Sequence, residues 1–316
     1  MIGNVGFRRD VTCYVRTVNH LVNKELVSSR MTYDQPMIAQ LVEALRSQTP
    51  RVQKSAYKRL VGLGVLSVQP LLNIIRDDDV QVQMLAKQIL VDIGKPSIPA
   101  LIAALDDDKL RTPATSVLSR FGAWPAKELV GALKSPNPKV AGAAATTLRL
   151  IGEPVIEALV EAMDGFDAAR RYSVIEILAS IRNPKITPIL IAALRDPDRD
   201  VAIRAINALT LVGDRNSVMP LLDTIAHPDI MVATRAIAAV GRLVDNRVLE
   251  ALIAALIEDE RELVKTMVLR TLGLRNDKIA IPFIEPLLEH PSRNVRDAAR
   301  LALHQLEYDF GNNGET

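Results

Sequence analysis

The stretch RDPDRDVAIRAINALTLVG, residues 195–213, opens with charges and a proline and then becomes almost entirely small and apolar. Val201, Ala205 and Leu209 are four residues apart, a spacing that places them on one face of an α-helix. The preceding DPD (196–198) contains residue types that end one helix and cap the next. The stretch therefore predicts a turn followed by an amphipathic helix that ends at a glycine.

The same pattern returns every 28 to 32 residues, and we number its positions from the first apolar residue as position 0. Position 0 is Val52, Val82, Leu110, Val140, Arg170, Val201, Val232, Val264 and Val295. Position 4 is small or β-branched, and position 8 is Leu or Val. Another amphipathic segment precedes each of these helices, so each repeat is predicted to be a hairpin with a first helix, a turn and a second helix. Hairpins of about 30 residues cannot bury an apolar face alone and must stack into an α-solenoid.

Composition agrees with an all-α fold, because 48% of the residues are apolar but only 3% are aromatic. A core of Ala, Leu, Ile and Val suits closely spaced helices. The net charge of +2 does not favour nucleic acid or anionic lipid as partner. Cys13 is the single cysteine, which excludes an internal disulfide and suits a reducing compartment. We expect a cytoplasmic protein, since no apolar run reaches the ~18 to 20 residues of a membrane span and no signal-peptide pattern is present.

The predicted domain organisation has three parts. Residues 1–36 form an amphipathic capping helix (8–29) and a hinge, although 34–36 could also be a helix start and the helix 8–29 could instead bind a partner or a membrane surface. Residues 308–316 form a disordered tail. Between them lie about nine hairpins over 37–307, with units at 37–64, 65–94, 95–122, 123–152, 153–183, 184–214, 215–245, 246–277 and 278–307.

The units IAALRDPDRDVAIRAINALTLVG (191–213) and LLEHPSRNVRDAARLALHQL (287–306) resemble HEAT repeats of the short, PBS-lyase HEAT-like type. The resemblance covers residues 37–307 and implies a superhelix whose second helices line a concave surface. The family motif usually has Arg at position 1, which Arg111, Arg171 and Arg296 keep, while Lys265 is conservative and the other units depart from it. Some family members are bilin lyases, but no bilin-handling residue can be transferred to this chain.

A search for catalytic chemistry finds none, so neither a cofactor nor a metal is predicted. The four histidines have no metal-binding partner at i+3 or i+4, and the His-Glu dipeptides of HEAT-repeat iron hydroxylases are absent. His227 and His290 precede prolines in equivalent turns, where a turn role is favoured over ligation. The acidic triplets 77–79 and 106–108 could hold a divalent cation. Because they recur at equivalent turns, helix capping is the favoured interpretation.

Positions 2, 6 and 9 of the second helices lie opposite the 0/4/8 stripe and predict the concave face. This face is small, neutral and partly apolar, which suits a protein segment better than a nucleic-acid backbone. Its predicted protein-binding residues, including Arg171 beside it, are Met84, Thr112, Ser116, Thr146, Arg149, Arg171, Tyr172, Glu176, Ile203, Asn207, Thr210, Thr234, Thr266 and Arg270.

The fifth unit departs most from the pattern, with Arg170 at position 0. Arg171 and Tyr172 follow it and are predicted to dominate the interface, since Arg and Tyr often do so. Alternatively, Phe166 fills the place of the missing Val. The predicted function is a non-enzymatic scaffold or adaptor that binds a partner protein. The alternatives are a subunit of a bilin lyase or a phycobiliprotein maturation or degradation factor, and a nucleic-acid-binding module of the HEAT-like glycosylase kind; the sequence leaves the oligomeric state open.

Overall fold

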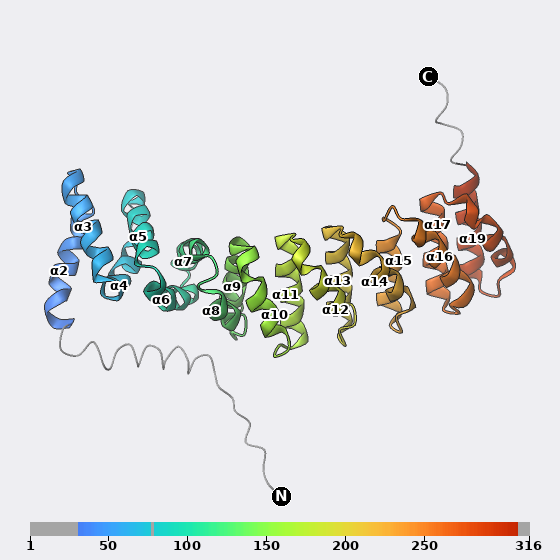
Figure 1. Ribbon diagram of the computed structural model, residues 1–316, viewed down its shortest axis with the longest axis horizontal. Coiled ribbons are helices and arrows are strands. Elements are labelled where there is room, and N and C mark those ends of the chain that lie inside the picture. The colour runs from blue at the N-terminus through green and yellow to red at the C-terminus, as the bar shows by residue number, and fades with distance from the viewer. Residues whose placement is uncertain (1–30, 77–78, 309–316) are drawn as a thin grey trace, which may run out of the picture. The chain divides into compact units, whose positions relative to one another are not determined.

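The computed structural model describes residues 31–76 and 79–308, and the chain divides into two compact units between Gly165 and Phe166. The fold is all-α, as predicted: the described residues contain helices and no strand. Within each unit, a first helix, a turn and a second helix alternate along the chain (Figure 1). The predicted capping helix 8–29 and most of the predicted tail lie outside the described residues.

In the first unit, α2, α4, α6, α8 and α10 are first helices, and α3, α5, α7 and α9 are second helices. Their bounds are α2 (Met31–Ala44), α3 (Pro50–Leu63), α4 (Val65–Ile74), α5 (Val80–Ile93), α6 (Ile98–Ala103), α7 (Arg111–Leu118), α8 (Ala126–Ala132), α9 (Pro138–Ile151) and α10 (Ile156–Met163). Short 3-10 turns extend them at η1 (Lys95–Ser97), η2 (Ala104–Asp106), η3 (Ser119–Phe121) and η4 (Glu153–Val155).

In the second unit, α11, α13, α15, α17 and α19 are second helices, and the others are first helices. Their bounds are α11 (Ala168–Ile181), α12 (Thr187–Ala193), α13 (Arg199–Val212), α14 (Val218–Asp223), α15 (Ile230–Val240), α16 (Asn246–Glu258), α17 (Glu262–Arg275), α18 (Ile281–Ile284) and α19 (Arg293–Tyr308). The 3-10 turns are η5 (Pro184–Ile186), η6 (Arg215–Ser217), η7 (Thr224–Ala226), η8 (Lys278–Ala280) and η9 (Glu285–Glu289).

Side chains in the hairpin turns cap the second helices, as the acids and amides there predicted. The Asp198 carboxylate accepts hydrogen bonds from the N–H groups of Asp200 and Val201, at 3.0 and 3.2 Å. Each such cap stabilises a helix by about 1 kcal/mol. The equivalent caps are Asp79, Asn137, Asp167 and Asp229.

The turn role of the two proline-preceding histidines is confirmed. Nδ1 of His227 accepts the N–H of Asp229 at 3.0 Å, and Nδ1 of His290 accepts the N–H of Ser292 at 3.1 Å. In the equivalent turn before α13, a carboxylate oxygen of Asp196 accepts the N–H of Asp198 at 2.9 Å. These imidazoles therefore shape the turn in the same way as an aspartate.

The second helices end where the chain reverses direction, and several of these ends need a positive φ. Gly213 has φ 68° and adopts the left-handed conformation. Arg182 takes the place of glycine after α11 with φ 53°, and Asn276 does so after α17 with φ 56°. A left-handed arginine costs about 1–2 kcal/mol, so the fifth repeat is strained at this point.

The predicted 0/4/8 stripe forms the core of both units. Val201, Ala205 and Leu209 are fully buried, and most of the equivalent residues of the other second helices are also buried. Within each unit, consecutive second helices pack directly on one another, such as α3 on α5 and α13 on α15. Small side chains at position 4 permit this close approach. Val52 is exposed because no second helix precedes α3 among the described residues.

Of the two alternatives for residues 34–36, a hinge or a helix start, the structure favours the second, because these residues lie in the first half of α2 and Pro36 is inside that helix. Pro36 removes one intrahelical hydrogen bond but does not end the helix. The predicted unit starting at residue 37 therefore begins earlier, at Met31. No single helix in the described ranges is long and apolar enough to cross a membrane; α5 joined to 95–106 reaches the required length only across a bend of 114°.

Glycines at position 9 allow α15 and α17 to touch. A methyl group on Gly241 would overlap Cγ2 of Thr271 and lie 3.3 Å from the carbonyl oxygen of Ile237, whereas one on Gly142 would meet nothing within 4 Å. We expect Gly241→Ala to lower the free energy of unfolding by about 1–3 kcal/mol through overpacking. Gly142→Ala, inside helix α9, should raise it by up to about 1 kcal/mol. Urea denaturation of both variants checks this, and equal effects would contradict the close packing at Gly241.

Candidate functional site

The second helices of the second unit bury a wider arc than the 0/4/8 stripe. Ala202 and Ile206, at positions 1 and 5, and Ala208, at position 7, are also buried. Each inner second helix packs against its own first helix and against a second helix on either side, as α13 does with α12, α11 and α15. The exposed face is therefore centred on positions 6 and 10, with position 2 at one edge and position 3 at the other. We call this the second-helix face.

This geometry corrects part of the predicted face. Thr234 at position 2 is only 7% exposed, and its hydroxyl donates to the carbonyl oxygen of Met231 at 3.1 Å. In the second unit position 9 is largely packed, since Ala179 and Gly273 are buried and Thr210 is half-buried, whereas Arg149 at position 9 of α9 is exposed. The sequence prediction placed the exposed face of each second helix directly opposite positions 0, 4 and 8. Because positions 1 and 5 are also buried, the exposed face is rotated about the helix axis toward position 10.

The other predicted residues are at least partly accessible. In the first unit, Met84, Thr112, Ser116, Thr146 and Arg149 are exposed. In the second unit, Tyr172 and Arg270 are exposed, and the residues that are half-buried are Glu176, Ile203, Asn207, Thr210 and Thr266.

The threonine hydroxyls on these faces already donate to their own helices. Thr146, Thr210 and Thr266 each donate to the carbonyl oxygen four residues earlier, at 2.7 to 2.9 Å. Their remaining capacity is to accept a hydrogen bond. They present mainly methyl groups to a partner.

Arg171, predicted to lie at the centre of the interface, does not lie on the second-helix face. Its guanidinium forms two hydrogen bonds of 2.7 Å with the Asp196 carboxylate and a third, of 2.9 Å, with the carbonyl oxygen of Phe166. These bonds join the turn before α11 to the turn before α13. Phe166 is buried, as expected if it replaces the missing Val at position 0.

Side chains at position 1 of other repeats also donate hydrogen bonds to backbone carbonyl oxygens at the end of the first helix. This explains the family's preference for Arg at position 1. Arg111 donates to the carbonyl oxygen of Leu105 at 2.8 Å, Lys265 to that of Leu256 at 2.7 Å, and Arg296 to that of His290 at 2.7 Å. The last carbonyl groups of a helix have no intrahelical partner. The position-1 side chain therefore closes the end of the first helix in its own hairpin.

Tyr172 is the centre of a polar and aromatic cluster on α11 and α13. The Arg204 guanidinium lies 5.8 Å from the Tyr172 ring centroid, within the range of a cation–π interaction. Nη2 of Arg204 is also 3.3 Å from a carboxylate oxygen of Glu176. The second-helix face thus holds an ordered Tyr172–Arg204–Glu176 cluster.

The prediction missed several exposed residues at positions 3 and 10 of this face. They are Arg235 at position 3, and Leu211, Arg242 and Leu274 at position 10; Arg204, also at position 3, is half-buried. A signal was present in the sequence, because positions 1 and 5 are apolar in α13 and α15 and indicate a buried arc wider than one stripe.

A polar network crosses three second-helix segments of the first unit. The Tyr57 hydroxyl donates to the Asp92 carboxylate, Gln88 donates to Asp92 at 2.8 Å, and Arg120 donates to Gln88 at 2.7 Å. Partial burial and then the Asp92 hydrogen bond and charge raise the pKa of Tyr57 to about 12. Tyr57 is therefore a hydrogen-bond donor that braces α3 against α5 rather than a proton-transfer group.

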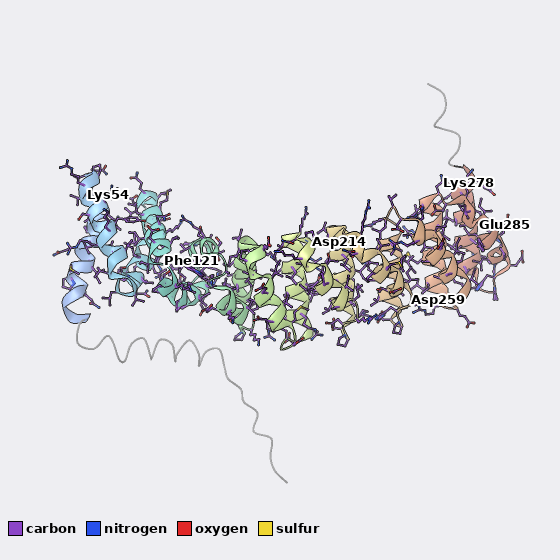
Figure 2. The ribbon with its side chains drawn as sticks, viewed as in Figure 1. Lys54, Phe121, Asp214, Asp259, Lys278 and Glu285 are labelled. Carbon is purple, nitrogen blue, oxygen red and sulfur yellow. The ribbon has the colours of Figure 1, made fainter. Side chains whose placement is uncertain are left out.

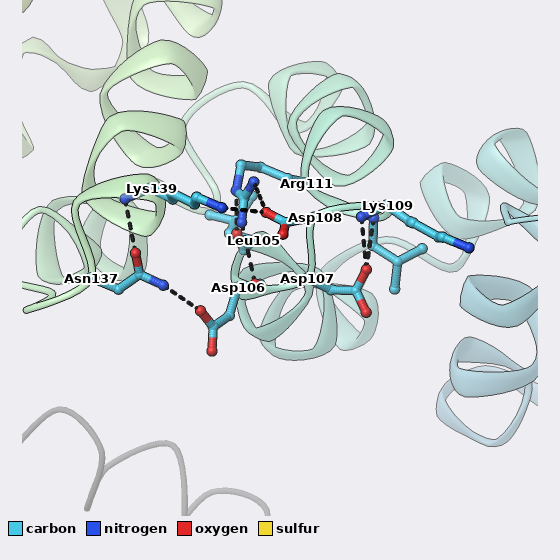
Figure 3. Close-up of polar contacts among 9 residues, drawn as sticks. Leu105, Asp106, Asp107, Asp108, Lys109, Arg111, Asn137 and Lys139 are labelled. Carbon is cyan, nitrogen blue, oxygen red and sulfur yellow. Dashed lines mark hydrogen bonds and ion pairs between the residues drawn. The ribbon is translucent and has the colours of Figure 1, made fainter.

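Each acid of the triplet Asp106 to Asp108 already has a partner (Figure 3). Asp107 accepts the N–H groups of Lys109 and Leu110, at 2.9 and 3.1 Å. Asp106 accepts from Asn137, and Asp108 pairs with Arg111 and Lys139. The Arg111 and then the Lys139 hydrogen bonds hold the pKa of Asp108 below its usual value. The predicted capping role therefore applies to Asp107, whereas Asp106 and Asp108 pair with side chains. No group of three or more potential metal ligands occurs within 31–76 and 79–308.

The turns within hairpins and the turns between consecutive hairpins lie at opposite edges of the second unit. Figure 2 shows Asp259, between α16 and α17, at one edge, and Asp214 and Lys278, which follow α13 and α17, at the other. Asp259 is held by Arg261 at 2.6 Å, and this hydrogen bond lowers the pKa of its carboxyl group. A cleft of about 610 Å³ opens at the edge that holds the turns between hairpins, and it is lined by 213–215, Val218 and 243–247.

Comparisons with known proteins point to one repeat type. A family model described as HEAT repeats matches residues 156–239, 186–267 and 249–311. The chain is 29% identical over 170 residues to the phycocyanobilin lyase subunit alpha of a Picosynechococcus species, covering 48% of this chain and 63% of the relative. It is 33% identical over 138 residues to the protein of the same name from a Nostoc species, covering 37% and 49%. The chain thus spans 63% of the length of the first relative and 49% of the second.

Solved structures with similar helical repeats include an engineered protein, with 18% identity, coverage of 95% and 96%, and a TM-score of 0.36. Human deoxyhypusine hydroxylase in complex with glycerol shows 18% identity, coverage of 88% and 98%, and a TM-score of 0.35.

The Arg171–Asp196 pair predicts a pH-dependent stability. Burial raises the pKa of Asp196, but the Arg171 hydrogen bonds, the N–H of Asp198 and the Arg171 charge outweigh it and hold that pKa below its usual value. A lowered pKa in the folded state stabilises the fold above the unfolded value of about 3.9, and this contribution is lost as the pH falls below it.

We expect Arg171→Gln to lower the free energy of unfolding by about 2–3 kcal/mol near neutral pH, because Asp196, only 7% exposed, loses its partner. The difference from wild type should shrink between about pH 5 and pH 3. Urea denaturation at several pH values measures it, with the exposed Arg195→Gln as a control of equal charge change. A difference that stays constant with pH would exclude this ion pair as its source.

Proposed function

We propose that this HEAT-like repeat protein is a non-enzymatic scaffold that binds a partner protein on the second-helix face of its second unit. The observation that carries the proposal is the exposure of large apolar side chains on that face. Leu211 is 55% exposed and Leu274 is 69% exposed, and Tyr172 lies on the same face of α11. Exposed apolar groups beside arginines and a tyrosine are typical of protein interfaces.

The mixture of side chains favours a protein partner over a small ligand. Tyr172 and Arg204 form a prearranged aromatic and cationic pair, and such residues contribute most of the binding energy in many interfaces. The neighbouring threonines offer methyl groups and acceptors rather than free donors. Helices packed on both sides hold these groups in place, so little ordering is needed on binding.

The proposal predicts that Leu211→Ser and Leu274→Ser together weaken partner binding. Each change removes an exposed apolar contact of about 1 kcal/mol, so we expect at least a tenfold loss of partner captured from a lysate of the source organism. Ile257→Ser is the matched control, because Ile257 is 61% exposed but lies on the first helix α16. It should leave capture and melting temperature unchanged.

Two results would contradict the scaffold function on this face. One is an equal loss of capture in Ile257→Ser, which would show that the effect is not specific to the second-helix face. The other is capture of nucleic acid with no stoichiometric protein, which would support the nucleic-acid alternative.

A second candidate function rests on the comparisons. Two relatives are named phycocyanobilin lyase subunit alpha, so this chain is proposed, as an alternative, to take part in bilin attachment or in phycobiliprotein maturation or degradation. The cleft bounded by 213–215 and 243–247 is within the size range of small-molecule sites.

The bilin alternative predicts that the purified chain changes the visible absorbance spectrum of phycocyanobilin on mixing. A bound tetrapyrrole is held in fewer conformations than a free one, so its absorption band should shift or sharpen. Titration of the chromophore with the chain, and with the unrelated protein serum albumin for comparison, measures the effect. An unchanged spectrum at the highest chain concentration would argue against this candidate.

A further inference from the structure

We propose that the partner segment bound on the second-helix face is an acidic amphipathic helix, whose carboxylates pair with Arg235, Arg242 and Arg270. This inference rests on the proposed scaffold function and names the chemistry of the partner. It arises from three arginines that the fold itself does not use.

The three arginines lie on neighbouring second helices. Arg235 is in α15, and Arg242 lies seven residues after Arg235, in the turn that follows α15. Seven residues correspond to about two helical turns, so both residues lie on the same side of α15, about 10 Å apart along its axis. Arg270 is in α17, which packs on α15. Gly241 and Thr271 touch at this contact, and they are the direct chain neighbours of Arg242 and Arg270. The three cations therefore belong to one surface.

None of the three has an internal partner within the described part of the chain. All are exposed, and no hydrogen bond or ion pair involves their guanidinium groups. Several other arginines of the second unit are engaged: Arg261 pairs with Asp259 at 2.6 Å, and Arg275 pairs with Asp277 at 2.7 Å. Arg182, Arg195 and Arg215 are exposed without such a pair, but they lie singly in the turns that follow helices. Arg235, Arg242 and Arg270 differ from these in lying together on adjacent second helices.

Acids on the neighbouring second helices do not pair with these arginines. Glu176 on α11 pairs with Arg204 at 3.3 Å, and Asp297 on α19 lies between Arg293 and Arg300, at 3.4 and 3.2 Å. Glu262, at the start of α17, accepts a hydrogen bond from the Ser292 hydroxyl at 2.8 Å. The guanidinium groups of Arg235, Arg242 and Arg270 are therefore open to carboxylates of a partner.

Helix stability explains only part of this arrangement. A cation such as Arg242 at the carboxyl end of α15 interacts favourably with the helix dipole. That effect falls off within one turn, so it does not apply to Arg235 near the middle of α15 or to Arg270 one turn before the end of α17. A ligand of opposite charge accounts for all three.

Carboxylates of a protein helix fit this surface better than the phosphates of a nucleic acid. Arginine binds a carboxylate through two parallel hydrogen bonds. Leu211 and Leu274 stand on the same face and would be left uncovered by a phosphate backbone, whereas the apolar stripe of an amphipathic helix would cover them. The chain as a whole is also close to neutral, unlike proteins that bind nucleic acid through charge.

The test uses a synthetic amphipathic helix of about 20 residues with a leucine stripe flanked by glutamates, and a counterpart with every glutamate replaced by glutamine. Fluorescence anisotropy with the full chain measures both affinities. We expect tighter binding of the glutamate peptide and a loss of affinity of about 2- to 5-fold for each of Arg235→Gln, Arg242→Gln and Arg270→Gln. The triple variant should lose about tenfold or more, and added salt should weaken binding.

Arg195→Gln is the matched control, because Arg195 is exposed in the second unit but lies in a turn at the end of a first helix. It should bind the glutamate peptide as wild type does. Equal affinity for the two peptides, an equal loss in Arg195→Gln, or tighter binding of an oligothymidine than of the glutamate peptide would overturn the inference.

The experiment separates this inference from the proposed function. If Leu211→Ser and Leu274→Ser abolish capture of the natural partner while the triple arginine variant retains it, the scaffold function stands and the acidic partner is excluded. If the leucine changes leave capture intact but peptide binding still depends on the three arginines, the carboxylate-binding surface stands and the proposed scaffold interface fails.

Discussion

The contact between consecutive second helices is the constraint on which the rest of each unit depends. Position 4 is Ala in most repeats, and position 9 is Gly where α15 meets α17 and where α17 meets α19. These small residues let the helix backbones approach closely, which buries the Val and Leu of positions 0 and 8 on both sides. Without this contact, a single hairpin would leave an apolar face in water.

At every hairpin turn, the last C=O groups of the first helix and the first N–H groups of the second have no intrahelical partner. Side chains in and beside the turn form hydrogen bonds with both sets of groups. Carboxylates such as Asp198 accept from the start of the second helix, and position-1 residues such as Arg111 and Lys265 donate to the end of the first. Most charged side chains of the turns therefore form hydrogen bonds or ion pairs within the fold. Arg171 and the acidic triplet 106–108 are examples, and their role is structural.

The exposed side chains that the fold does not need for its own hydrogen bonds and ion pairs form the surface available for function. Along the second-helix face, Tyr172 and Arg204 are prearranged, whereas Arg235, Arg242 and Arg270 are free of internal partners. The face is thus more basic and more apolar than positions 2, 6 and 9 suggested. A scaffold of this kind recognises its partner through side chains that the repeat pattern leaves unconstrained, so these vary from repeat to repeat.

Sequence alone determined the repeat, the helical hairpins, the buried stripe and the turn caps, because these follow from local spacing and from residue types with one dominant role at a helix end. It did not determine which side of each second helix stays open. That depends on neighbours on both sides, which bury Ala202 and Ile206 and turn the face from position 9 toward position 10. Nor could it show that Arg171 is held by Asp196 while Arg235 is free, since a side chain's partners come from residues one repeat away and are fixed only when the hairpins stack.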